Sequence, residues 1–106
     1  DDLAAVFCEN DQMALGAAAA IDEQGKTGSI LVYGFDGNDD ALAAIKEGKM
    51  GGTVAQDPYG MGSLGVELAY KLCNGETLTE DELDDTGNKV FLAPVKVVDK
   101  TGTTRN

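Results

Sequence analysis

Short apolar runs alternate with segments of helical periodicity, and this alternation limits the fold more than any other feature of the sequence. Leu3 to Cys8, Ser29 to Phe35 and Gly51 to Gln56 are short and mostly apolar, as buried strands are. Residues 13–23 and 41–45 lie between them and place alanine, leucine and isoleucine on one side of a helix. Strands that alternate with helices form parallel sheets joined by right-handed crossovers. We therefore expect an α/β fold, an open parallel sheet with flanking helices.

Polar residues and glycines mark where the helices begin and end. Asn10 or Asp11 is a suitable N-cap for the first helix, and Asn38 or Asp39 for the second, because such side chains accept hydrogen bonds from unpaired backbone N–H groups. A glycine follows each helix and favours its end. A third helix is expected to begin at Pro58, whose missing N–H would be unpaired in a first turn.

The third helix is expected to run to Asn74-Gly75 and to have an apolar stripe formed by Leu64, Leu68 and Leu72. An acidic segment, residues 80–85, follows it and is best explained as a solvated loop. Residues 89–99 are then expected to be extended, with an interruption at Pro94, and to add the last strand to the parallel sheet.

The charge of the chain excludes two classes of partner. Its 106 residues include 19 acidic and 8 basic side chains, for a formal net charge of −11. Such an excess of negative charge repels phosphate backbones and anionic lipid, so we expect no nucleic-acid partner. No apolar run approaches the ~20 residues that span a bilayer.

The sequence contains little that could perform catalysis or hold a metal. Histidine is absent, which removes the commonest general base and a frequent zinc ligand. The two cysteines, Cys8 and Cys73, have no metal-like spacing and are either free thiols or a disulfide. No nucleophile stands beside a base in a recognisable pattern. We therefore predict that the chain is not an enzyme and that it has no catalytic residues, metal or cofactor.

Polar side chains follow three consecutive predicted strands. Glu9-Asn10-Asp11 follows the first strand, Asp36 ends the second, and Gln56-Asp57 ends the third. Ligands of open α/β sheets bind beyond the carboxyl ends of the strands, so these side chains are candidates for one site. Carboxylates and amides together can satisfy sugar hydroxyls, which both donate and accept hydrogen bonds. The alternative is that Asn10 and Asp36 only cap the helices that follow them.

The order of short motifs along the chain points to a family. It includes N-D-x-M-A-L-G from Asn10, G-F-D-G from Gly34 and T-V-A-Q-D-P from Thr53. With these motifs the chain resembles, over essentially its whole length, the C-terminal part of type I periplasmic sugar-binding proteins, the ribose, galactose and glucose receptors of bacterial ABC transporters. The resemblance implies an extracytoplasmic receptor, periplasmic or lipid-anchored, that captures a monosaccharide such as galactose, glucose or ribose and presents it to a membrane permease.

The same resemblance assigns roles to three residues. Asn10 matches an asparagine expected to hydrogen-bond sugar hydroxyls, Asp36 matches a main hydroxyl acceptor, and Gln56 matches an amide expected on the same ligand. Galactose-binding relatives have a calcium-ligating glutamate at the position of Ala4. The resemblance therefore implies a sugar site without a metal.

Only the last third of such a two-lobed protein is represented. The resemblance implies that residues 1–56 belong to the C-terminal lobe, residues 57–92 to the other lobe, and residues 93–106 to a return strand and tail. Since most of both lobes lies outside this sequence, we expect the isolated chain to bind sugar weakly or not at all. The apolar stripe of the third helix would lack its native sheet, so we expect it to repack onto the remaining sheet or to mediate homo-oligomer formation.

Three other functions have weaker support. Gly60 to Gly65 matches the dinucleotide fingerprint G-x-G-x-x-G, but a helix that begins at Pro58 leaves no phosphate-binding loop there. A receiver domain phosphorylated on Asp36 would need a lysine after a later strand, which is missing. The effector-binding part of a lactose-repressor-type transcription regulator shares the expected fold and stays the alternative.

Overall fold

The structure is a computed structural model, and it describes residues 2–79 and 95–102. The chain divides into two compact units. Residues 2–56 and 95–102 lie in the first unit, and residues 57–79 lie in the second. The division falls directly after Gln56, where the resemblance places a crossing between lobes. That the second unit belongs to another lobe of a longer protein stays a prediction.

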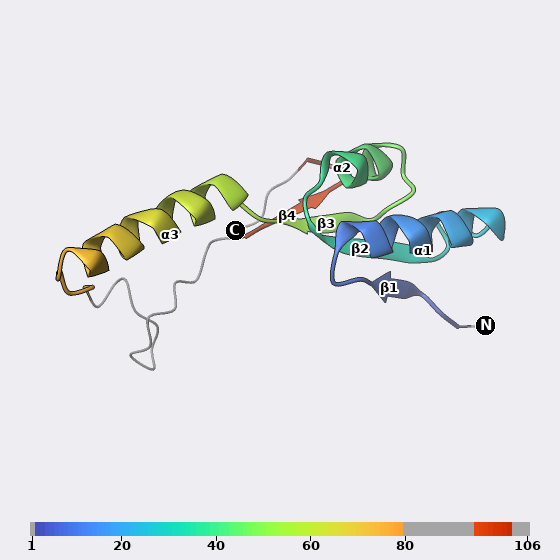
Figure 1. Ribbon diagram of the computed structural model, residues 1–106. Coiled ribbons are helices and arrows are strands. Elements are labelled where there is room, and N and C mark those ends of the chain that lie inside the picture. The colour runs from blue at the N-terminus through green and yellow to red at the C-terminus, as the bar shows by residue number, and fades with distance from the viewer. Residues whose placement is uncertain (1, 80–94, 103–106) are drawn as a thin grey trace. The chain divides into compact units, whose positions relative to one another are not determined.

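The first unit is built on one four-stranded sheet (Figure 1). Its strands are β1 (Ala5–Phe7), β2 (Leu31–Asp36), β3 (Gly52–Ala55) and β4 (Lys96–Asp99), in the order β1-β2-β3-β4. β1 pairs with β2, and β2 pairs with β3, in parallel register. The predicted α/β class is therefore confirmed, and these three strands end at the same edge of the sheet.

The last strand differs from the prediction, because β4 pairs with β3 in antiparallel register and the sheet is mixed. Ala55 at the end of β3 lies opposite Lys96 at the start of β4, and Gly52 lies opposite Asp99. The chain thus leaves and re-enters the sheet at the same end. A parallel fourth strand would need a crossover that returns the chain to the opposite end of the sheet. The chain enters β4 at the end of the sheet where it left β3, so β4 is antiparallel to β3.

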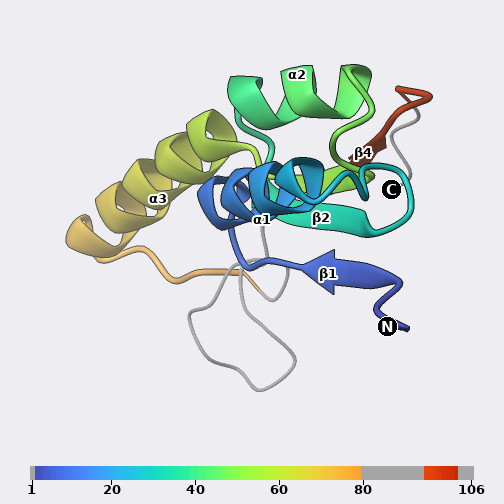
Figure 2. The ribbon, with the colours of Figure 1, turned by 90° about the vertical axis from the view of Figure 1, so that its right-hand side faces the viewer.

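Two helices cover one face of this sheet (Figure 2). They are α1 (Asp11–Glu23) and α2 (Asp39–Lys46), each of which connects two neighbouring parallel strands. The buried apolar residues come from these helices, from β2 and from the turn before β3, and they are Ala14, Ala18, Val32, Ala41, Ala44, Ile45 and Met50. Most are small, which lets the helices approach the sheet closely. The approach is close at Gly34, where an added Cβ would lie 3.1 Å from the Cβ of Ala14.

The other face of the sheet is apolar and partly exposed. Side chains alternate along a strand, and Val32 and Gly34 face the helices, so Leu31, Tyr33 and Phe35 project from the opposite face. Phe7 and Val97, on the flanking strands, are exposed by 62% and 43% of their surface. Within residues 2–56 and 95–102 no helix lies over this face.

The second unit contains α3 (Pro58–Cys73). Asp57 caps it by accepting a hydrogen bond of 2.9 Å from the Gly60 N–H, and Pro58 stands in the first turn as predicted. None of the residues of α3 is classed as buried. Repacking of its leucine stripe stays a prediction. The predicted acidic loop, residues 80–85, and most of the segment 89–99 lie outside the described residues.

Candidate functional site

The carboxyl edge of the sheet brings two of the three predicted site residues into direct contact. The Nε2 group of Gln56 donates a hydrogen bond of 2.7 Å to Oδ1 of Asp36. The backbone N–H of Gln56 also donates to the backbone carbonyl of Asp36, at 3.0 Å. This follows from the register, because Asp36 and Ala55 are partners in the β2–β3 ladder and Gln56 is the next residue. Parallel pairing therefore brings these two residues side by side at the edge of the sheet.

The backbone of Asp36 is held in an unusual conformation. Its φ is +121°, the one positive value at a non-glycine position among the described residues, and Gly37 follows with φ of +82°. An L-residue in this region costs of order 1–3 kcal/mol, and such strain is concentrated at ligand sites. The chain at the end of β2 is thus bent sharply, and Asp36 rather than a glycine occupies the strained position.

Asn10 lies at the same edge, in the turn after β1, but it has a structural role as well. Its Oδ1 accepts a hydrogen bond of 2.9 Å from the N–H of Met13 and so caps α1. The capping interpretation is therefore correct for the oxygen of Asn10. It is not correct for Asp36, because α2 begins after Asn38, which is in the N-cap position and makes no side-chain cap bond. Within residues 2–79 and 95–102 no hydrogen bond joins Asn10 to Asp36 or Gln56.

Asp11 is the residue whose importance the sequence analysis missed. Its side chain is fully buried and accepts three hydrogen bonds. Oδ2 accepts from the N–H of Gly37 at 2.8 Å and of Asn38 at 2.7 Å, and Oδ1 accepts from the hydroxyl of Thr53 at 2.6 Å. The sequence offered Asp11 only as a strand-end residue and an alternative cap. Gly34 lies against Asp11 and leaves no room for a side chain. This glycine within a predicted strand is the signal in the sequence that could have pointed to a close contact.

The polar groups left at this edge suit a hydroxylated ligand. Gln56 uses Nε2 for Asp36, and Asn10 uses Oδ1 for the helix cap. In the described part of the chain, Oδ2 of Asp36, the amide oxygen of Gln56 and the amide nitrogen of Asn10 have no protein partner. Two acceptors and one donor can pair with hydroxyl groups, which donate once and accept twice.

Other kinds of site are absent from the part of the chain that the structure describes. No three acidic or cysteine side chains there lie close enough together to hold a metal ion. Cys8 and Cys73 are free thiols. None of the helices with described residues has the length and hydrophobicity needed to cross a membrane.

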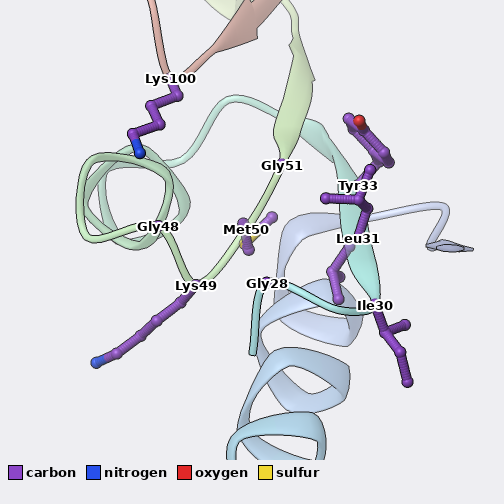
Figure 3. A pocket seen from close by; sticks show the side chains of 10 residues that line it. Gly28, Ile30, Leu31, Tyr33, Gly48, Lys49, Met50, Gly51 and Lys100 are labelled. Carbon is purple, nitrogen blue, oxygen red and sulfur yellow. The ribbon is translucent and has the colours of Figure 1, made fainter. Parts of the chain in front are cut away.

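A separate hollow of about 300 Å³ lies at the opposite end of the parallel strands. It is formed by the first half of β2, the turn before β3 and Lys100 (Figure 3). Figure 3 shows Lys49 extending away from Met50 and Leu31, and its ammonium forms an ion pair of 2.8 Å with Glu47. The Glu47 carboxylate raises the pKa of Lys49 above its ordinary value. The hollow contains none of the predicted site residues, so it is distinct from the carboxyl edge.

Comparison with known proteins assigns the chain to a family. Residues 1–77 match the family described as "Periplasmic binding protein domain". The chain belongs to this family. The ribose import binding protein RbsB of Bacillus subtilis (strain 168) is 46% identical over 91% of the chain, and RbsB of Haemophilus influenzae is 49% identical over 71%. The predicted resemblance is therefore confirmed.

A solved member of the periplasmic binding protein family has the same fold. It is the periplasmic solute-binding protein of an ABC transporter from Actinobacillus succinogenes 130z, solved with bound D-allose. Its TM-score is 0.78 at 33% identity over 92% of the chain. The chain spans 28% and 25% of the two RbsB proteins and 31% of the Actinobacillus chain. It therefore corresponds to about a quarter to a third of the length of these family members.

Proposed function

We propose that this chain forms one wall of a monosaccharide site in an extracytoplasmic receptor of an ABC importer. The main support is the pairing of Asp36 with Gln56 at the carboxyl edge of the sheet, with Asp36 held in a strained conformation. Asn10, at the end of the neighbouring strand, adds an amide donor. Hydrogen bonds from sugar hydroxyls to a carboxylate are charge-assisted and stronger than those between neutral groups.

The relatives support the class of ligand. The RbsB proteins are named for ribose import, and the Actinobacillus protein was solved with D-allose, so we propose ribose or a related monosaccharide, including galactose or glucose. These relatives are binding proteins, and we propose the same non-enzymatic role here. The membrane permease of an importer would be the partner of the intact protein. The family and the Actinobacillus protein are both described as periplasmic, which supports our proposal of an extracytoplasmic location, periplasmic or lipid-anchored.

The regulator alternative gains no specific support. The three relatives reported above are binding proteins of importers, and no described residue argues for regulation over transport. The net charge of −11 also opposes a nucleic-acid partner for this chain.

We also propose that the chain can form a homo-oligomer through α3. Tyr59, Val66 and Tyr70 lie on one side of this helix, at spacings of seven and four residues, and are 86%, 73% and 68% exposed. The leucine stripe lies on the other side. A helix that is apolar on two sides is typically buried between partners. A second copy of the chain could supply that partner.

The isolated chain is expected to bind monosaccharides with dissociation constants above about 1 mM, the value that corresponds to only about 4 kcal/mol. One wall leaves most of a pyranose in water, whereas small-molecule sites bury most of their ligand. Isothermal titration calorimetry with D-ribose, D-galactose, D-glucose and D-xylose measures this. Micromolar binding of any of the four would show that one wall is sufficient, contrary to this expectation.

The role of Asp36 can be measured where the second wall is present. In a chimera, this chain replaces the matching part of the Bacillus subtilis RbsB protein, and D-ribose is titrated. Asp36→Asn is expected to weaken binding roughly 10- to 100-fold, because hydrogen bonds to charged groups contribute about 1.5–3 kcal/mol.

Asp40→Asn is the matched control, since Asp40 is an exposed carboxylate in the first turn of α2 and is not one of the predicted sugar-binding residues. It should leave the affinity for ribose unchanged. Equal affinities of the Asp36 and Asp40 variants would contradict the proposed wall.

A further inference from the structure

The fully buried carboxylate of Asp11 has no part in the proposed sugar contacts, yet it touches the segment that displays Asp36. We infer that Asp11 is a positioning residue that holds the turn at Asp36–Asn38 in its strained conformation and so keeps Asp36 in contact with Gln56. The ligand that Asp36 would meet rests on the proposed function, but the positioning itself does not.

The first step of the argument concerns which groups Asp11 binds. Its Oδ2 accepts from two consecutive N–H groups, those of Gly37 and Asn38. These residues lie between the end of β2 at Asp36 and the start of α2 at Asp39, so neither the sheet nor the helix supplies a partner for these two donors. Asp11 therefore supplies the acceptor that the turn itself lacks.

The second step concerns strain. Asp36 and Gly37 both have positive φ, and for Asp36 this conformation is unfavourable unless the surroundings stabilise it. Asp36 itself is bonded to Gln56, and the two hydrogen bonds from Gly37 and Asn38 to Asp11 hold the chain immediately after the strained residue. Without an acceptor at this place, the turn would be expected to relax, and the bond between Asp36 and Gln56 would be lost with it.

The third step concerns how firmly Asp11 is itself fixed. Its Oδ1 accepts from the Thr53 hydroxyl on β3, and its Cα would lie only 3.3 Å from a Cβ added at Gly34. Asp11 thus contacts both β2 and β3 from the first turn of α1. Because Gln56 follows β3 and Asp36 ends β2, one carboxylate links the two strands that hold the two site residues.

The test separates positioning from simple stabilisation and uses NMR of the complete 106-residue chain. One readout is the coupling between the amide and α protons of Asp36, which reports φ. The other is the pair of side-chain amide proton resonances of Gln56, which the bond to Asp36 shifts. In Asp11→Ala we expect the Asp36 coupling to move toward the value of an extended residue and the Gln56 resonances to move toward those of a free amide.

Thr53→Val is the matched control, because it removes the other hydrogen bond of Asp11 and leaves the bonds to Gly37 and Asn38. Thr53→Val should lower the unfolding midpoint but change neither the Asp36 coupling nor the Gln56 side-chain amide resonances. If Asp11→Ala does not fold, Asn38→Pro decides, since it deletes one donor at a φ of −65° that proline adopts readily. Asn38→Ala keeps the N–H and should behave as the unchanged protein.

A loss of stability with unchanged Asp36 and Gln56 values, in Asp11→Ala or in Asn38→Pro, would overturn the inference and leave Asp11 as a structural residue only. The conformation that matters for ribose binding in the RbsB chimera is the one in which Asp36 contacts Gln56. A variant that lowers the population of this conformation tenfold should weaken ribose binding roughly tenfold. If the resonances respond but ribose binds no variant, the positioning inference stands and the sugar proposal fails.

Discussion

Replacing Gly34 with alanine is expected to destabilise the chain by at least about 3 kcal/mol. The new Cβ would overlap Oδ1 of Asp11 and lie 3.1 Å from the Cβ of Ala14. Overpacking of a core by one methyl group costs about 1–3 kcal/mol. Displacement of the Asp11 carboxylate would also leave the buried Thr53 hydroxyl unpaired, at about 1–3 kcal/mol, together with the half-buried N–H groups of Gly37 and Asn38. Urea unfolding followed by circular dichroism measures the change.

Gly16→Ala is the control for Gly34→Ala. Gly16 lies within α1, and a Cβ added there meets no atom within 4 Å. This variant should gain up to about 1 kcal/mol of stability, because alanine is the better helix former. If both variants unfolded at the same urea concentration, the close approach of Asp11 to β2 would be wrong.

A shortened chain that lacks residues 57–94 is expected to fold. Ala55 and Lys96 are partners in the antiparallel β3–β4 ladder, so an Asn-Gly turn placed between Gln56 and Val95 would make a two-residue hairpin loop. The hairpin replaces a connection of roughly forty residues. Since each doubling of loop length costs about 0.6 kcal/mol, it should add about 2.5 kcal/mol of stability. Thermal unfolding by circular dichroism measures the midpoint, which should be raised by several degrees.

Residues 1–56 alone are the control for the shortened chain. They lack β4, so β3 loses its edge partner, and their unfolding midpoint should fall below that of the full chain. Sedimentation velocity on the same proteins tests the proposed association through α3. The full chain should form oligomers, and the shortened chain should not. An unfolded shortened chain would contradict the independence of the first unit.

The strands and helices of the first unit could be predicted because their signals are local. Apolar runs, helical periodicity and N-capping residues each depend on neighbours within a few positions. The proximity of Asp36 and Gln56 was also predictable, since parallel strands end at one edge and both residues stand at strand ends. Their direct hydrogen bond then follows from a register that sequence periodicity does not specify.

The antiparallel β4 was not predictable from the alternation of elements. The pattern of strand, helix and strand is the same whether the connecting helix packs as a crossover or belongs to a separate unit. The structure assigns α3 to a compact unit separate from the sheet. Only the three-dimensional packing therefore decided the direction of the last strand.

The sequence by itself determined the α/β class, the position of each helix in the first unit and the set of polar residues at the strand ends. The tertiary structure decided that Asp11 is buried, that the backbone of Asp36 is strained and that β4 is antiparallel to β3. The reason is the range of the interactions. The partners of Asp11 lie 26, 27 and 42 residues along the chain, so a carboxylate that looks like a helix cap in sequence becomes a buried hydrogen-bond acceptor only when three strands are assembled.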